Sequence, residues 1–244
     1  MQLIENVLFE PVGCLADFPV EPFNEIAVRV FGRRKKPGRS ASRTYWHLLN
    51  LMPASGRQLD HAERSVVEAL ELEAVAGAAV YEDDVPALSE LNASMGIHSI
   101  RLFIASSLSS IAVTRFVDQG GLTPFFSGVW SRDTAGGIKA APLARAIEGA
   151  SLAPERTMYL VDTAEGLKVA TDVGVNAILM MNDPDEARRL ALRNPAGGIV
   201  SLHELPDFIR LVAAEHAPRS VRSTPADSSS PGTTMPGGVR DRPR

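Results

Sequence analysis

Cysteine, long apolar runs and excess positive charge are all scarce in this sequence of 244 residues. Its one cysteine, Cys14, excludes an intramolecular disulfide and favours a reducing compartment. No uninterrupted apolar run approaches the roughly 18 to 20 residues of a membrane span. The first residues lack a basic region followed by an apolar core, so we expect no signal peptide. These absences predict a soluble, cytoplasmic protein with no membrane partner.

The charge of the chain gives no reason to expect a nucleic-acid partner, because the formal net charge is −4. A basic segment occupies residues 33–39 and would suit docking of an anionic substrate or a protein partner. Short basic clusters are common on protein surfaces, so a solvated loop is the favoured interpretation. Residues 216–244 are rich in Pro, Ser, Thr, Gly and Arg without apolar periodicity. We expect a disordered tail there, which is the other candidate contact for a protein partner.

The length and the pattern of elements indicate a core with an insert. The chain is long enough for one large domain or for a core plus a smaller unit, and its hydrophobic content of 45% is typical of globular proteins. We find no internal repeat. Short buried strands alternate with helices in most of the sequence, but the region after residue 16 predicts three helices and no strand. The last of these begins near Asp60, a residue suited to cap a helix.

The segment 6–15 carries the first residues of chemical interest. Residues 7–9 are an apolar run with β-branched and aromatic members, and Pro11 and Gly13 follow them, which favours a short buried strand. Glu10 falls where that strand would end. Open α/β sheets bind their ligands at the carboxyl ends of strands. Glu10 is therefore a candidate site residue.

Three later segments also place polar or charged side chains at the ends of elements. Ser106 and Ser107 follow a buried strand predicted over residues 100–105, although two serines taken alone indicate only a turn. Lys139 precedes a predicted helix. Asp162 ends another buried strand, and a helix continues after it. These four residues join Glu10 as candidates for one site.

The four segments, in this order, resemble the four motifs of the haloacid dehalogenase-like (HAD) superfamily, of the phosphoglycolate phosphatase and β-phosphoglucomutase type. The resemblance covers about residues 6–212. It implies an α/β fold: a Rossmann-like parallel sheet with helices on both faces and a helical cap inserted between the first two motifs. Applied to this chain, it predicts a core of residues 1–16 and 79–215 with a cap of residues 17–78.

The resemblance also implies how the first and fourth motifs would act. In the family, the first motif supplies an aspartate nucleophile and, two residues later, an aspartate that acts as general acid and base. Glu10 and Val12 stand at those positions here, so the motif is degenerate: it keeps the apolar run and Gly13 but lacks both aspartates. Asp162 matches the aspartate that holds Mg²⁺, and Glu10 with the backbone carbonyl of Val12 would complete the metal ligands.

The second and third motifs would bind phosphate. Ser106 matches the hydroxyl that hydrogen-bonds the phosphoryl oxygens, and the backbone N–H of Ser107 is a further donor. Lys139 matches the lysine that neutralises both nucleophile and phosphate, which gives it a catalytic and a substrate-binding role. The resemblance therefore implies Mg²⁺ as cofactor and a phosphorylated small molecule as substrate.

The degenerate first motif leaves three hypotheses for function. A carboxylate one methylene longer lies about 1 Å out of line, which can reduce the rate about 100-fold, and loss of a general acid typically removes a further 10²–10⁴. The first hypothesis is therefore a HAD-like phosphohydrolase relative that binds Mg²⁺ and a phosphorylated small molecule with weak or lost hydrolysis. The alternatives are an active phosphomonoester phosphatase that uses Glu10, and a non-catalytic scaffold that acts through the basic loop or the tail.

Overall fold

The computed structural model describes residues 3–33, 40–54, 58–93 and 100–215. Most of the predicted basic loop and the whole predicted tail, 216–244, lie outside the described residues, so the expectations about both stay predictions. A search of the helices in the described ranges finds none with the length and apolarity needed to cross a membrane.

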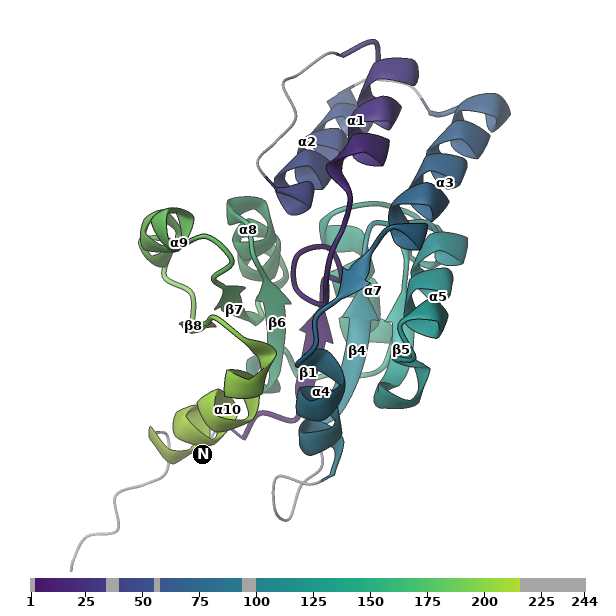
Figure 1. Ribbon diagram of the computed structural model, residues 1–244. Helices are drawn as coiled ribbons and strands as arrows, with labels where there is room; N and C mark the ends of the chain where they lie inside the picture. Colours follow the sequence, from purple (N-terminus) through teal and green to yellow (C-terminus); the bar gives the residue numbers. More distant parts are fainter. Residues whose placement is uncertain (1–2, 34–39, 55–57, 94–99, 216–244) are drawn as a thin grey trace, which may run out of the picture.

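Six parallel strands form the central sheet, in the order β5-β4-β1-β6-β7-β8 (Figure 1). Their bounds are β1 Asn6–Phe9, β4 Arg101–Ala105, β5 Phe126–Trp130, β6 Thr157–Val161, β7 Asn176–Met180 and β8 Gly197–Ile199. Strand β1 is buried along its whole length, as its continuous apolar run predicts for a central parallel strand. Phe9 lies opposite Ile104 of β4 and Leu160 of β6, so the residues that follow these three strands meet at one edge.

Helices cover both faces of the sheet. In Figure 1, α4 and α10 lie in front of it, and α7 and α8 lie behind it. The bounds are α4 Asp84–Asn92, α5 Ser110–Gln119, α6 Arg132–Ala135, α7 Ala140–Gly149, α8 Ala164–Val173, α9 Pro184–Ala191 and α10 Leu205–Glu215. Short 3-10 turns occupy η1 Thr123–Phe125, η2 Pro154–Arg156 and η3 Leu202–Glu204. The predicted α/β fold class is confirmed.

Three further helices stand over the carboxyl edge of the sheet (Figure 1), and we call them the helical cap: α1 Val20–Arg29, α2 Ala41–Ala54 and α3 His61–Ala76. The chain leaves the core through β2, Ala16–Asp17, and returns through β3, Ala79–Val80, and these two strands pair antiparallel. The sequence-based division into core, cap and tail stays a prediction, and the β2–β3 pair lies where that division places its two junctions.

The start of α3 follows the capping signal seen in the sequence. The Asp60 carboxylate accepts a hydrogen bond of 2.9 Å from the Glu63 backbone N–H, and the Glu63 carboxylate accepts one of 3.1 Å from the Asp60 N–H. This reciprocal pair satisfies two backbone donors at the helix end. The predicted cap at Asp60 is confirmed, and it fixes the first turn of a helix whose later turns reach the core.

Candidate active site

The residues that follow β1, β4 and β6 converge beneath the helical cap. The Ser106 hydroxyl donates a hydrogen bond of 2.8 Å to Oε1 of Glu10. Asp162 follows β6, the neighbour of β1 on its other side. The exposed fractions of Glu10, Ser106 and Asp162 are 2%, 1% and 9%, so the three polar side chains share one enclosed place. The structure therefore brings together candidates that are up to 152 residues apart in the sequence by their numbering.

The turn after β1 is built around Gly13. Its φ of 85° lies in the left-handed region that favours glycine. A Cβ at this position would collide with Oδ2 of Asp162 and with the hydroxyl of Ser42. Val12, just before it, is fully buried, and its backbone N–H interacts with the Glu10 carboxylate. Glycine is thus required for Asp162 to approach the turn, and an apolar side chain fills the position beside it.

Asp162 has two very different carboxylate oxygens. Oδ2 accepts a hydrogen bond from the Ser42 hydroxyl and a longer one, 3.4 Å, from Nδ2 of Asn182. The same Asn182 amide donates to the carbonyl of Gly13 at 2.6 Å. Oδ1 is buried and has no hydrogen-bond partner among the described residues. Buried acceptors are normally satisfied, so Oδ1 is the oxygen of Asp162 that is available to a ligand.

Burial governs the protonation of both carboxyl groups. Burial and, to a smaller extent, the charge of Asp162 together raise the pKa of Glu10 to about 8, against the opposing hydrogen bonds from Ser106 and the Val12 N–H. Burial raises the pKa of Asp162 to about 7, against the opposing hydrogen bond from Ser42. Without a cation, Glu10 is therefore mostly protonated at pH 7. A cation between the two groups would stabilise both ionised forms.

The donor atoms present suit Mg²⁺, which prefers hard oxygen ligands. Glu10 and Asp162 offer carboxylate oxygens, including the unpartnered Oδ1, and the backbone carbonyl of Val12 is the predicted third ligand. The described residues hold no cluster of three or more His, Cys, Asp and Glu side chains around one point. A magnesium ion here would therefore depend on two carboxylates, backbone oxygen and water.

Lys139 joins this region through its backbone. Its N–H donates a hydrogen bond of 2.7 Å to the hydroxyl of Ser107, and its φ is 61°, a rare conformation for a residue other than glycine. Its side chain is half-buried, and within the described parts of the chain it forms no ion pair with Glu10 or Asp162. The structure places Lys139 next to Ser107, and the role of its amino group stays a prediction.

The cap contributes two polar residues that the sequence analysis did not identify. Ser42 and Tyr45 are three positions apart on α2 and so lie on one face of the helix. Ser42 contacts Asp162, and the Tyr45 hydroxyl lies 3.4 Å from Oγ of Ser106. Either hydroxyl can be the donor in that pair. In the sequence, Tyr45 shares a helical face with apolar residues such as Leu48, and no local pattern marks Ser42.

A buried ion pair joins the cap to the core near Ser107. Glu71 of α3, 1% exposed in its side chain, binds the guanidinium of Arg132 in α6, with an Oε2–Nη2 distance of 3.0 Å. Glu71 also accepts the Ser109 backbone N–H at 3.1 Å, and Arg132 donates to the Ser107 carbonyl at 3.2 Å. These contacts connect α3 to the segment that carries the second motif.

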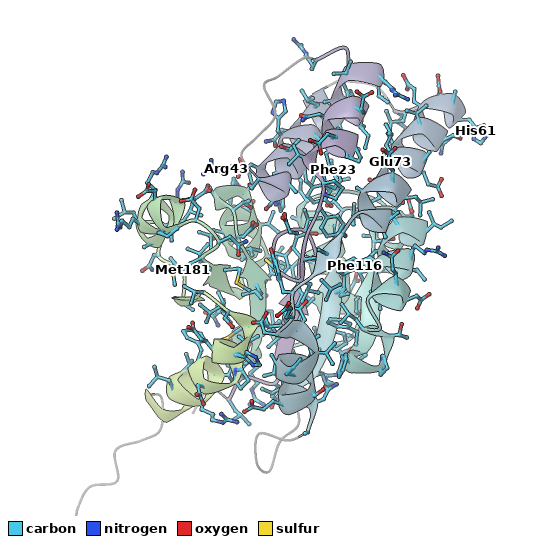
Figure 2. All side chains as sticks on the ribbon, viewed as in Figure 1. Phe23, Arg43, His61, Glu73, Phe116 and Met181 are labelled. Atoms are coloured by element: carbon cyan, nitrogen blue, oxygen red, sulfur yellow. The ribbon has the colours of Figure 1, made fainter. Side chains whose placement is uncertain are left out.

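A second ion pair lies beside Asp162. Nε of Arg43 in α2 donates a hydrogen bond of 2.8 Å to Oε1 of Glu186 in α9. A cavity of about 290 Å³ lies here. Figure 2 labels two of its lining residues, Arg43 on the cap helix α2 and Met181 just after β7. The cavity is lined by Ser40, Arg43, Asp162, Met180, Met181, Asn182, Asp183, Pro184, Glu186, Ala187 and Leu190. Asp162 thus lies between the enclosed site and a polar cavity at the boundary of cap and core.

Solved structures with this architecture come from several bacteria. A haloacid dehalogenase-like hydrolase from Streptococcus pneumoniae is 18% identical with a TM-score of 0.64, over 85% of this chain and 99% of that one. A predicted phosphatase from Clostridium acetobutylicum is 15% identical with a TM-score of 0.65, over 86% and 99%. L-2-haloacid dehalogenase from Xanthobacter autotrophicus is 18% identical with a TM-score of 0.56, over 85% and 99%. At these identities the likeness establishes the fold.

The family comparison agrees with the fold. No curated protein matches the sequence. The family model described as haloacid dehalogenase-like hydrolase matches residues 57–180, about half of the chain. The match includes Ser106, Lys139 and Asp162 and begins after the segment that carries Glu10. The chain belongs to the haloacid dehalogenase-like hydrolase family.

Proposed function

We propose that this protein is a HAD-type phosphohydrolase relative that binds Mg²⁺ and a phosphorylated small molecule, and that its own hydrolytic activity is weak or lost. One observation carries the proposal: the Ser106 hydroxyl bonds to Glu10 at the same buried edge as Asp162, while the fully buried side chain of Val12 offers no proton. Groups suited to hold a phosphate and a cation support the binding role, and valine at the position of the family's general acid supports weak or lost hydrolysis.

The phosphate would be held by groups from the second and third motifs. The Ser106 hydroxyl, now turned to Glu10, would turn to a phosphoryl oxygen, and the Ser107 N–H is the adjacent donor. The Lys139 amino group has no ionic partner among the described residues, which supports its role as the fixed positive charge for an anion. These groups orient the phosphate toward Glu10.

Glu10, Asp162 and the Val12 carbonyl would hold Mg²⁺, whose charge would offset that of the phosphoryl oxygens. The chain itself contributes position: Asp162 is fixed by Ser42 and Asn182, and Glu10 by Ser106. Enclosure by the cap would keep bulk water from the phosphate.

Two features oppose efficient turnover. Glu10 is one methylene longer than the family's aspartate, and a displacement of about 1 Å can reduce the rate about 100-fold. Val12 cannot protonate the leaving alkoxide, which typically removes a further 10²–10⁴. A second candidate function, an active phosphomonoester phosphatase, is favoured by the way Ser106 fixes the Glu10 carboxyl at the end of the central strand. The two candidates differ in whether Glu10 acts as a nucleophile.

Calorimetric titration with MgCl₂, followed by a panel of phosphate monoesters, tests the proposal. We expect Mg²⁺ binding that falls at least about 10-fold in Asp162→Asn, with turnover far below that of an active phosphatase. Asp172→Asn is the matched control, because Asp172 lies on the exposed side of α8 and, among the described residues, pairs only with Lys168. Rapid Mg²⁺-dependent turnover that Glu10→Gln abolishes would establish the active phosphatase instead. No binding of Mg²⁺ or of any ester would favour the scaffold hypothesis.

A further inference from the structure

The structure assigns Ser42 and Asn182 as positioning residues for Asp162. We propose that they hold one of its carboxylate oxygens so that the other faces the cation, and that the cation site is complete only while α2 lies against the core. The inference rests on the proposed function, since it concerns the cation expected at Asp162.

The asymmetry of the Asp162 carboxylate is the first argument. The two side-chain donors, the Ser42 hydroxyl and the Asn182 amide, both bind Oδ2, and the buried Oδ1 has no hydrogen-bond partner among the described residues. A carboxylate held in this way has one orientation and one free oxygen. Such outer contacts fix the geometry of metal ligands, and their removal typically weakens metal binding 10–100-fold.

The origin of the two donors is the second argument. Asn182 belongs to the core, where its amide also holds the Gly13 carbonyl at 2.6 Å and so joins the turn after β1 to the end of β7. Ser42 belongs to the cap, and it is 2% exposed. Asp162 is therefore oriented from both sides of the cap–core boundary, and the cap half of the support is lost if α2 moves away.

Neighbouring contacts hold α2 in the required place. The Tyr45 hydroxyl, on the same face as Ser42, lies 3.4 Å from Ser106, and Arg43 is paired with Glu186 at 2.8 Å. One cap helix thus contacts residues that follow three strands of the sheet: Ser106 after β4, Asp162 after β6 and Glu186 after β7. If the docked α2 strengthens cation binding, a bound cation must by linkage strengthen the docking of α2 by the same factor.

The opposite outcome has a clear structural meaning. The Ser42 hydroxyl could compete with the cation for Asp162 rather than support it. In that case the docked α2 would block the cation site, and removal of the Ser42 hydroxyl would raise the affinity for the cation. The position of Ser42 on Oδ2, together with the free Oδ1, favours support over competition.

The first experiment titrates MgCl₂ into the full-length protein and into Ser42→Ala, Ser42→Thr and Ser65→Ala. We expect Ser42→Ala to weaken Mg²⁺ binding about 10–100-fold, and Ser42→Thr to recover most of it because it keeps the hydroxyl. Ser65→Ala is the matched control: Ser65 is exposed on α3, and within the described part of the chain its hydroxyl bonds only to the His61 carbonyl. Circular dichroism confirms that each variant is folded.

The second experiment measures the coupling between cation binding and the docking of α2 without an activity assay. Hydrogen exchange of the α2 backbone is compared with and without MgCl₂, and we expect slower exchange with the ion in the unaltered protein and a smaller effect in Ser42→Ala. Equal or tighter Mg²⁺ binding by Ser42→Ala, or α2 exchange that does not respond to Mg²⁺, would overturn the inference and leave the proposed function standing. Absence of Mg²⁺ binding in the unaltered protein would overturn both.

Discussion

Glu71 of α3 and Arg132 of α6 form a buried, two-pronged ion pair between the helical cap and the core. The side chains are 1% and 16% exposed, so water does little to screen them. The pair sits against the backbone of Ser107 and Ser109, directly beside the second motif. The cap is therefore attached to the core at a point distinct from the contact between Arg43 and Glu186.

Removal of one partner of this pair should destabilise the protein strongly. In Glu71→Gln the Arg132 charge stays buried without its counter-charge, and we expect a loss of about 3–5 kcal/mol in the free energy of unfolding, measured with urea. Glu148→Gln is the control, because Glu148 pairs with Arg145 on the exposed surface and should change stability by at most about 1 kcal/mol. A similar small change for both variants would show that the buried pair does not anchor the cap.

The buried carboxyl group of Asp84 should make the stability of the protein depend on pH. Its side chain is fully buried at the start of α4, and neither carboxylate oxygen has a hydrogen-bond partner among the described residues. Burial, with a smaller effect from the charge of Asp83, raises its pKa from 3.8 to about 8. Between these values the unfolded chain has released the proton and the folded chain keeps it. Stability should therefore fall as the pH rises from about 4 to 8, by up to about 1.4 kcal/mol per pH unit.

Asp84→Asn tests this relationship, because the amide has the shape of the acid and never ionises. We expect the variant to melt at a higher temperature than the unaltered protein at pH 8, and the difference to shrink toward pH 5. Asp172→Asn on the surface of α8 should show no such trend. If the melting temperatures of Asp84→Asn and of the unaltered protein differ by the same amount at every pH in this range, the prediction is contradicted.

Gly13 should tolerate no side chain. Gly13→Ala combines backbone strain at φ 85° with a collision against Asp162 and Ser42. Gly174 has nearly the same φ, 83°, but open space around it, so Gly174→Ala measures the strain alone, about 1–2 kcal/mol. We expect a clearly larger loss of stability for Gly13→Ala, together with weaker Mg²⁺ binding. Equal losses for the two alanines would mean that Asp162 does not need the close approach.

Restoration of both family acids should raise phosphatase activity more than either change alone. Glu10→Asp would bring the nucleophile into line, and Val12→Asp would supply the proton to the leaving group in the same transition state, so the effects are not independent. We expect the double variant to exceed the unaltered protein by about 100-fold or more on the ester panel.

The stability of that double variant must be checked first by circular dichroism. Val12 is fully buried, and an unpaired carboxylate in its place would be destabilising. If the folded double variant binds Mg²⁺ but hydrolyses no ester, damage to the first motif is not the only barrier, and the scaffold hypothesis gains support.

The sequence by itself determined the fold class and the residues at the strand ends. Apolar runs of a few residues predicted the buried strands, and Glu10, Ser106 and Asp162 stand at their carboxyl ends in the structure. Such patterns are local, and the geometry of a parallel sheet then places the strand ends at one edge. Helix α9 escaped prediction because only Leu190 of its eight residues is buried, so it lacks an apolar stripe, although Asp183 and Pro184 supply a start signal.

Only the tertiary structure decided which cap residues reach the site. Ser42 and Asp162 are 120 positions apart, Glu71 and Arg132 are 61 apart, and Asn182 and Gly13 are 169 apart. The polar side chains among them have an ordinary local context, on a helix or after a strand. What makes them functional candidates is the tertiary packing at the carboxyl edge of the sheet, which brings their polar groups within hydrogen-bond distance of one another. No periodicity of a single segment records that arrangement, because it depends on contacts between segments far apart in the sequence.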